Sequence, residues 1–69
     1  MSEFIIDENI FEELVKEYKL SIDQSKVLRN ILENPEGMFF VLHRSPLDTD
    51  QRLKTLSVFL KYREKIGLK

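Results

Sequence analysis

Residues 21–35 read SIDQSKVLRNILENP, and this stretch decides the class of fold that we expect. Ser21 and Gln24 have the spacing of a capping box, in which a hydroxyl and an amide close the first turn of a helix. Apolar residues then recur at helical spacing, namely Val27, Leu28, Ile31 and Leu32. Pro35 disfavours the α conformation for the residue before it, so this helix should end at Asn34. The stretch therefore predicts a capped amphipathic helix with one buried face.

Similar patterns on either side predict two further helices, over about residues 8–19 and 49–66. Asp7 and Asp48 suit their N-cap positions, because a carboxylate can accept hydrogen bonds from the free N–H groups of a first turn. The last helix should bury a stripe formed by Leu53, Leu56, Phe59, Leu60 and Ile66. Together the helices predict a core that contains Phe11, Leu14, Leu28, Ile31, Leu56, Phe59 and Leu60.

The apolar segment 38–42, which reads MFFVL, is too short for its pattern to separate a strand from a helix. We predict an all-α fold, a compact bundle of three helices, or of four if a short helical turn forms near residues 38–44. The alternative is an α+β fold in which residues 4–6 and 38–42 pair as two short strands. With 69 residues, the chain has room for one domain, so residues 1–69 are expected to form a single unit.

Composition excludes several classes of function. The chain has no cysteine and one histidine, so we expect no disulfide, no metal site and no cofactor. The longest apolar run has five residues, far fewer than the roughly 20 that cross a bilayer. The N-terminal sequence lacks the basic and apolar regions of a signal peptide, which predicts a cytoplasmic location and no membrane partner. His43 and Ser45 are too close together on the chain for a good nucleophile–base pair, so we expect no enzymatic activity.

Charge divides the chain into two halves. Residues 1–39 carry four basic and nine acidic side chains, a net charge of −5, whereas residues 40–69 carry seven basic and three acidic ones, a net charge of +4. Such asymmetry suits a charged partner, or packing of the two halves against each other. In the second half a basic ridge is expected along the last helix, formed by Lys54, Lys61 and Lys65.

Protein binding is the function that these features favour. Apolar and aromatic residues stand directly before His43 and Arg44, and aromatic residues and arginine are common energetic hot spots at interfaces. We therefore predict a stoichiometric binding module, such as an inhibitor, an immunity factor or a regulatory adaptor. The predicted partner contacts are Lys26, Arg29, Asn30, Glu33, Phe39, Leu42, His43 and Arg44. The same apolar segment could instead pair with a second copy to form a homodimer.

DNA binding is the alternative hypothesis. Two helices separated by a short break at Leu20 and Ser21 have the outline of a helix-turn-helix. The contacts to nucleic acid would then come from the second helix or from the basic ridge of Lys54, Lys61 and Lys65. Against this hypothesis, the net charge is −1 and the turn contains no glycine, whereas nucleic-acid-binding domains are typically strongly basic.

Three short patterns resemble the small helical immunity proteins that neutralise colicin-type nucleases. They are FEELVKE at residues 11–17, ENPEG at residues 33–37, and Tyr62-Arg63 followed by Gly67 and Lys69. The resemblance implies a helical fold, a bacteriocin partner and binding through the second and third helices. Two features depart from the family. Leu42 and His43 stand nearest to the family's toxin-anchoring Tyr-Tyr pair, and the second helix offers Lys26 and Arg29 where the family is acidic.

Overall fold

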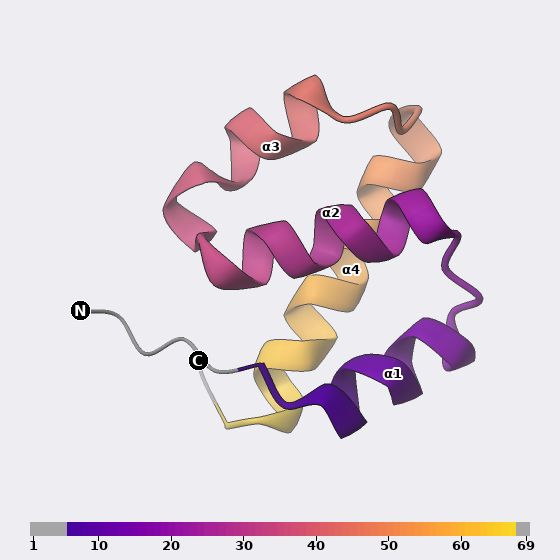
Figure 1. Cartoon of the computed structure of the whole chain (residues 1–69), viewed down its shortest axis with the longest axis vertical. Helices are drawn as coiled ribbons and strands as arrows, with labels where there is room; N and C mark the ends of the chain where they lie inside the picture. Colours follow the sequence, from indigo (N-terminus) through magenta and orange to yellow (C-terminus); the bar gives the residue numbers. More distant parts are fainter. Residues whose placement is uncertain (1–5, 68–69) are drawn as a thin grey trace.

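The computed structural model describes residues 6–67, and these residues form a bundle of α-helices (Figure 1). The elements are α1 (Glu8–Glu17), α2 (Ile22–Glu33), the short 3₁₀ helix η1 (Pro35–Gly37), α3 (Met38–Arg44) and α4 (Thr49–Lys65). Helix α2 lies across α4, with α3 beside α2 on one side and α1 against α4 on the other (Figure 1). The radius of gyration is 11.2 Å, which matches the value of about 11 Å expected for a compact chain of this length. The predicted all-α bundle is confirmed, in its four-helix form.

The three long helices begin at the residues that the sequence predicts. Asp7 accepts hydrogen bonds from two backbone N–H groups of the first turn of α1. At α2 the capping box is complete, because the Gln24 N–H donates to Ser21 Oγ at 3.1 Å and the Ser21 N–H donates to Gln24 Oε1 at 3.0 Å. Asp48 and Gln51 form the same box at α4, with distances of 2.9 and 3.1 Å. Local sequence therefore determines where these helices start.

Helix α1 ends in a Schellman motif built on an unusual residue. The Leu20 N–H donates to the carbonyl of Val15 at 3.0 Å, and the Lys19 N–H donates to that of Lys16 at 3.2 Å. This pattern requires a left-handed residue after the C-cap, a position that glycine usually takes. Here Lys19 takes it, with φ of 54°, whereas Gly67 (φ 87°) takes the equivalent position after α4. The motif turns the chain within three residues and lets α2 start at once.

The core lies where α2 crosses α4, and α1 packs against α4 to extend it. Leu28 and Ile31 of α2, Val58 of α4 and Leu14 of α1 are completely buried. The other buried apolar side chains are Phe11, Val27, Leu32, Leu42, Leu47, Phe59 and Tyr62. Of the predicted core, Phe11, Leu14, Leu28, Ile31 and Phe59 are confirmed.

The predicted buried face of α4 is partly wrong. Leu60 is 59% exposed and Leu53 is 58% exposed, while Leu56 is only partly buried and Ile66 is exposed. Helix α4 instead buries Thr55, Val58, Phe59 and Tyr62. These four have spacing i, i+3, i+4 and i+7, so they also form a helical stripe, rotated from the predicted one. Two stripes overlap on this helix, and packing against α2 selects the one that contains a threonine and a tyrosine.

The segment 38–42 is helical, so the alternative pairing of residues 38–42 with residues 4–6 is wrong. Residues 4 and 5 lie outside the described residues. The 3₁₀ turn of η1 leads directly into α3, and Leu42 and Leu47 anchor the segment in the core. A helix satisfies its own backbone hydrogen bonds, whereas a lone strand would leave its backbone groups without a partner.

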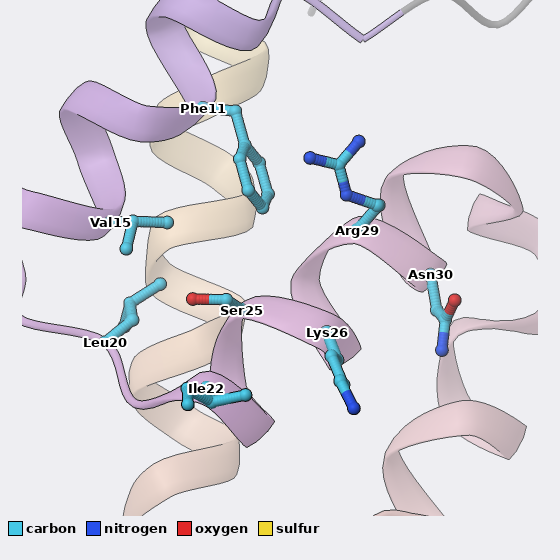
Figure 2. Close-up of a pocket in the computed structure, with 8 residues that line it drawn as sticks. All are labelled: Phe11, Val15, Leu20, Ile22, Ser25, Lys26, Arg29 and Asn30. Carbon is cyan, nitrogen blue, oxygen red and sulfur yellow. The ribbon is translucent and has the colours of Figure 1, made fainter.

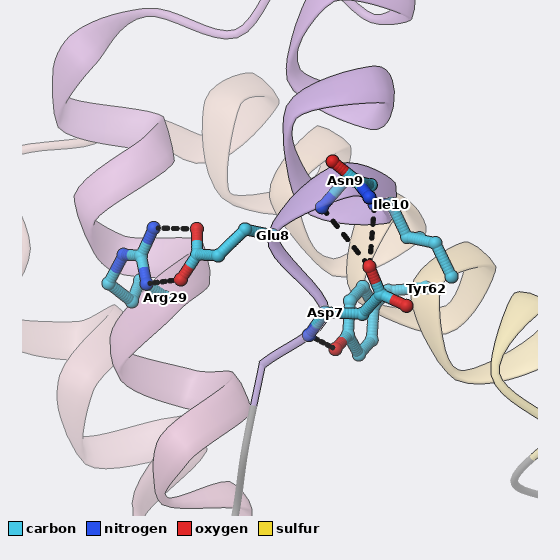
Figure 3. Close-up of polar contacts among 6 residues, drawn as sticks. All are labelled: Asp7, Glu8, Asn9, Ile10, Arg29 and Tyr62. Atoms are coloured by element: carbon cyan, nitrogen blue, oxygen red, sulfur yellow. Dashed lines mark hydrogen bonds and ion pairs between the residues drawn. The ribbon is translucent and has the colours of Figure 1, made fainter.

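Hydrogen bonds from polar side chains join the ends of α4 to the starts of α2 and α1. Buried Thr55 donates through Oγ1 to the carbonyl of Gln51 at 2.8 Å, and Gln24 Nε2 lies 3.5 Å from the same oxygen. At the other end of α4, the hydroxyl of buried Tyr62 accepts a hydrogen bond from the Asp7 N–H at 2.8 Å (Figure 3). Hydrogen bonds are needed at these places because a buried polar group without a partner destabilises the fold.

Candidate protein-binding surface

Helix α3 projects two aromatic rings away from the bundle. Phe39 is 79% exposed and Phe40 is 61% exposed, although phenylalanine is among the residues most often buried. Arg44 lies one helical turn after Phe40, and its guanidinium carbon is 4.3 Å from the centre of the Phe40 ring. This contact is a cation–π pair on the protein surface. Among residues 6–67 Arg44 forms no ion pair, so its charge faces solvent beside the two rings.

A groove of about 390 Å³ separates α2 from α3. Lys26 and Asn30 of α2 line one side of it, and Phe40 and Arg44 of α3 line the other. These four residues, of which Lys26, Asn30 and Arg44 are predicted partner contacts, therefore lie on one continuous surface. They come together because η1 reverses the chain and lays α3 beside α2 (Figure 1).

A second groove, of about 490 Å³, lies between α3 and α4. Its lining consists of Phe39, Phe40, Leu42, His43, Arg52 and Leu56. Leu42 requires a correction, because it is only 6% exposed and belongs to the core, so it forms the floor of the groove and not an exposed contact. His43 is exposed, and its backbone carbonyl lies 3.4 Å from Nη2 of Arg52.

A third groove, also of about 490 Å³, lies between α1 and α2. Figure 2 shows Phe11 and Val15 of α1 on one side and Lys26 and Arg29 of α2 on the other. The predicted contacts Lys26 and Asn30 line this groove as well as the one beside α3. The exposed face of α2 therefore joins the two grooves.

Arg29 is already engaged within the chain. It donates two hydrogen bonds of 2.9 Å to the Glu8 carboxylate (Figure 3). Its guanidinium carbon lies 4.5 Å from the centre of the Phe11 ring. These hydrogen bonds, together with the positive charge of Arg29, lower the pKa of Glu8, and the hydrogen bond to Glu8 raises the pKa of Arg29. The side chains of Arg29 and Glu8 are 39% and 56% exposed, so the pair links α1 to α2 at the surface.

The remaining predicted residues lie elsewhere. Glu33 is exposed at the end of α2 and lines none of the three grooves. Lys54, Lys61 and Lys65 are exposed on α4, as the predicted basic ridge requires. Lys61 lies 3.8 Å from the Glu64 carboxylate, which is a loose surface ion pair.

The sequence did not identify Arg52, Leu53, Leu56 and Leu60 as surface candidates. Arg52 and Leu56 line the groove beside α3, and the exposed leucines continue along α4 from there. The three leucines were predicted to be buried because they are apolar. One feature of the sequence could have identified them. Helix α4 contains two overlapping apolar stripes, and because only one face of a helix can pack against a single neighbouring layer, the other stripe should be exposed.

The described part of the chain shows no cluster of three or more histidine, aspartate or glutamate side chains that could hold a metal ion. None of the helices within residues 6–67 is both long enough and apolar enough to cross a membrane. What the surface offers is a set of open grooves with aromatic and cationic side chains. Comparison of the chain with protein-family models, with curated proteins and with solved structures finds no match.

Proposed function

We propose that this chain is a small non-catalytic module that acts by stoichiometric binding to a protein partner, as an inhibitor, an immunity factor or a regulatory adaptor. The observation that carries the proposal is the exposure of Phe39 and Phe40 next to Arg44. Burying a phenylalanine side chain is worth about 1.5–3 kcal/mol, so two exposed rings represent free energy that folding does not use. A protein partner that covered them would gain it.

The geometry around the rings supports a protein ligand. Grooves flank α3 on both sides, and polar side chains such as Lys26, Asn30 and His43 stand at their edges. An apolar centre within a polar rim is the usual anatomy of a protein interface. The grooves are open and shallow, unlike the enclosed pockets that hold most small molecules.

Immunity against a nuclease bacteriocin is the specific form that the sequence resemblance suggests. A basic nuclease would meet Lys26 and Arg29 on the outer face of α2, and like charges disfavour such contact. The core of the proposal is therefore binding through α3 and its flanking grooves, with the identity of the partner left to experiment.

Affinity capture tests this proposal. We would immobilise the chain, pass over it a nuclease-treated cytoplasmic extract, and identify retained proteins by mass spectrometry. The chain and an Ile22→Gln variant should retain the same protein in near-equal molar amount, whereas a Phe39→Gln, Phe40→Gln variant should lose it. Ile22 is the matched control because it is 75% exposed and, although it lines the groove between α1 and α2, it lies outside both grooves beside α3 through which binding is proposed. Equal retention of the partner by the chain and both variants, or no retained protein, would contradict the proposal.

The exposed ridge of Lys54, Lys61 and Lys65 favours nucleic-acid binding as the second candidate function. These lysines are spaced at i, i+7 and i+11 on α4, so they share one side of the helix. Neutralisation of phosphates by lysine releases counterions, so affinity for DNA would fall steeply as salt concentration rises. A fluorescence titration with duplex DNA at several salt concentrations measures this slope. A Lys54→Gln, Lys61→Gln, Lys65→Gln variant should flatten it if the ridge contacts phosphates.

A further inference from the structure

The exposed apolar surface extends beyond α3 onto α4. Leu56 shares a groove with Phe39, and Leu53 and Leu60 lie three residues before and four residues after Leu56 on the same side of α4. Both of these outer leucines are more than half exposed. Phe39, Phe40 and Leu56 thus line one groove, and Leu53 and Leu60 continue the row of Leu56 along α4; these five residues are called here the α3–α4 apolar face.

The charged side chains on the α3 side of the α3–α4 apolar face are arginines. Arg52 and the imidazole of His43 line its groove, and Arg44 lies over the Phe40 ring. Between Met38 and Leu47 the chain has no acidic residue, and no carboxylate lines the groove. Asp50 and Glu64 lie at the two ends of the leucine row, three residues before Leu53 and four residues after Leu60, and Glu64 lies 3.8 Å from Lys61. Within the groove the fixed charge is positive, so an acidic ligand would complement the groove and a basic one would be repelled.

The spacing of the leucines suits a helical ligand. Leu53 and Leu60 are seven residues apart on α4, which corresponds to about 10 Å along the helix axis. An amphipathic helix lying in the groove presents apolar anchors at i, i+3 or i+4, and i+7 over the same length. Addition of an extended strand needs an open sheet edge, and residues 6–67 contain no strand.

From these observations we propose that the α3–α4 apolar face binds an acidic amphipathic helix of the partner protein. The partner's apolar residues would contact Phe39, Leu56 and Leu60, and its carboxylates would pair with Arg44 and Arg52. This inference rests on the proposed function and names the kind of partner segment that the module recognises.

A displayed peptide library tests the inference directly. Each peptide would carry fixed leucines at i, i+3, i+4 and i+7, with flanking positions drawn equally from glutamate, lysine and glutamine. Selection on the immobilised full chain should enrich glutamate over lysine at the flanking positions. Because the whole chain has a net charge of −1, its overall charge cannot produce that preference. Enrichment of lysine, or equal representation of the three residues, would overturn the inference.

Variants locate the binding site of the selected peptides. Their affinity should fall at least about tenfold for a Phe39→Gln, Leu60→Gln variant, as expected when central apolar anchors are lost, and stay unchanged for Ile22→Gln. An Arg44→Glu variant should reduce or reverse the preference for glutamate. All substituted side chains are exposed, and circular dichroism would confirm that each variant is folded. Unchanged affinity in the Phe39→Gln, Leu60→Gln variant would refute the assignment to this face.

Two further outcomes would overturn the inference while leaving the proposed function intact. Retention of no peptide, together with capture of a partner protein that needs Phe39 and Phe40, would show that the partner does not dock as an acidic helix. Analytical ultracentrifugation provides the other readout. A dimer that dissociates on Leu60→Gln substitution would show that a second copy of the chain covers the face.

Discussion

Helix α3 and the crossing of α2 over α4 use their apolar residues in opposite ways. At the crossing both helices have complete capping boxes, and side chains such as Leu28 and Val58 are completely buried. Helix α3 has no side-chain N-cap, buries only Leu42, and exposes Phe39 and Phe40. The crossing therefore accounts for folding, whereas the outer face of α3 contributes little to it. Apolar residues that folding leaves exposed are the ones to explain by binding.

The largest expected loss of stability comes from removing a buried aromatic ring from the core between α2 and α4. A Phe59→Ala substitution should destabilise the chain by about 3–5 kcal/mol through lost burial and a residual cavity. A domain of 69 residues has a total stability of about 3–10 kcal/mol, so this variant should be partly or wholly unfolded at 37 °C. Urea denaturation followed by circular dichroism measures the loss. The adjacent Leu60→Ala variant is the control, and it should change stability by no more than about 0.5 kcal/mol. Equal losses in the two variants would show that the buried face of α4 is assigned wrongly.

A second pair of variants sharpens the contrast within α3 itself. Leu42→Ala should cost about 2–3 kcal/mol because it empties a core position, whereas Phe39→Ala should cost about 0.5 kcal/mol or less because its ring is in solvent. Urea denaturation gives both values. Native-state hydrogen exchange adds a local readout, in which the amides of α3 should exchange faster than those of α2. A Phe39→Ala loss as large as that of Leu42→Ala would mean that the aromatic face supports the fold.

Removal of the side-chain caps tests how much they stabilise the long helices, because α3 has no such cap. Ser21→Ala and Asp48→Ala should each cost about 1 kcal/mol, because each leaves backbone N–H groups of a first turn without an acceptor. Ser57→Ala is the matched control, since Ser57 is exposed inside α4 and alanine is the better helix former. Thermal unfolding would rank the three variants. A cost for Ser57→Ala equal to that of the caps would contradict the role assigned to the capping boxes.

The smallest expected effect concerns the surface pair of Glu8 and Arg29. Its hydrogen bonds lower the pKa of Glu8 in the folded chain, so its contribution to stability is present above the unfolded value of about 4.3 and is lost as the pH falls through the lower folded value. The stability difference between the chain and a Glu8→Gln variant should therefore shrink on acidification. An NMR titration of the Glu8 carboxyl group should show its midpoint rising in Arg29→Gln. A midpoint unaffected by that substitution would show that the pair does not form in solution.

Local signals predicted much of the helical framework. The caps at Asp7, Ser21 and Asp48 and the stop at Pro35 are short-range features, and each operates within one turn of its helix. The helical state of residues 38–44 could not be decided in this way. It depends on the long-range burial of Leu42 and Leu47, which periodicity in a five-residue apolar run does not reveal.

The candidate site was likewise predicted only in part from the sequence. Aromatic and arginine residues after Gly37 indicated a binding segment, and the structure exposes Phe39, Phe40 and Arg44 together. The sequence could not show that Leu42 points inward while its neighbours point outward, nor that Arg29 is held by Glu8. Those facts depend on contacts between helices that are distant in the chain.

By itself the sequence determined the helical class, the starts of the three long helices and the absence of cysteine chemistry. Capping and composition act locally, so they need no knowledge of the packed chain. Only the tertiary structure decided which of two apolar stripes on α4 is buried. Packing against α2 selected the stripe with Val58 and Phe59, and left Leu53 and Leu60 exposed to solvent. Either stripe satisfies helical periodicity, and the choice between them is made by the shape and volume of the neighbouring helix.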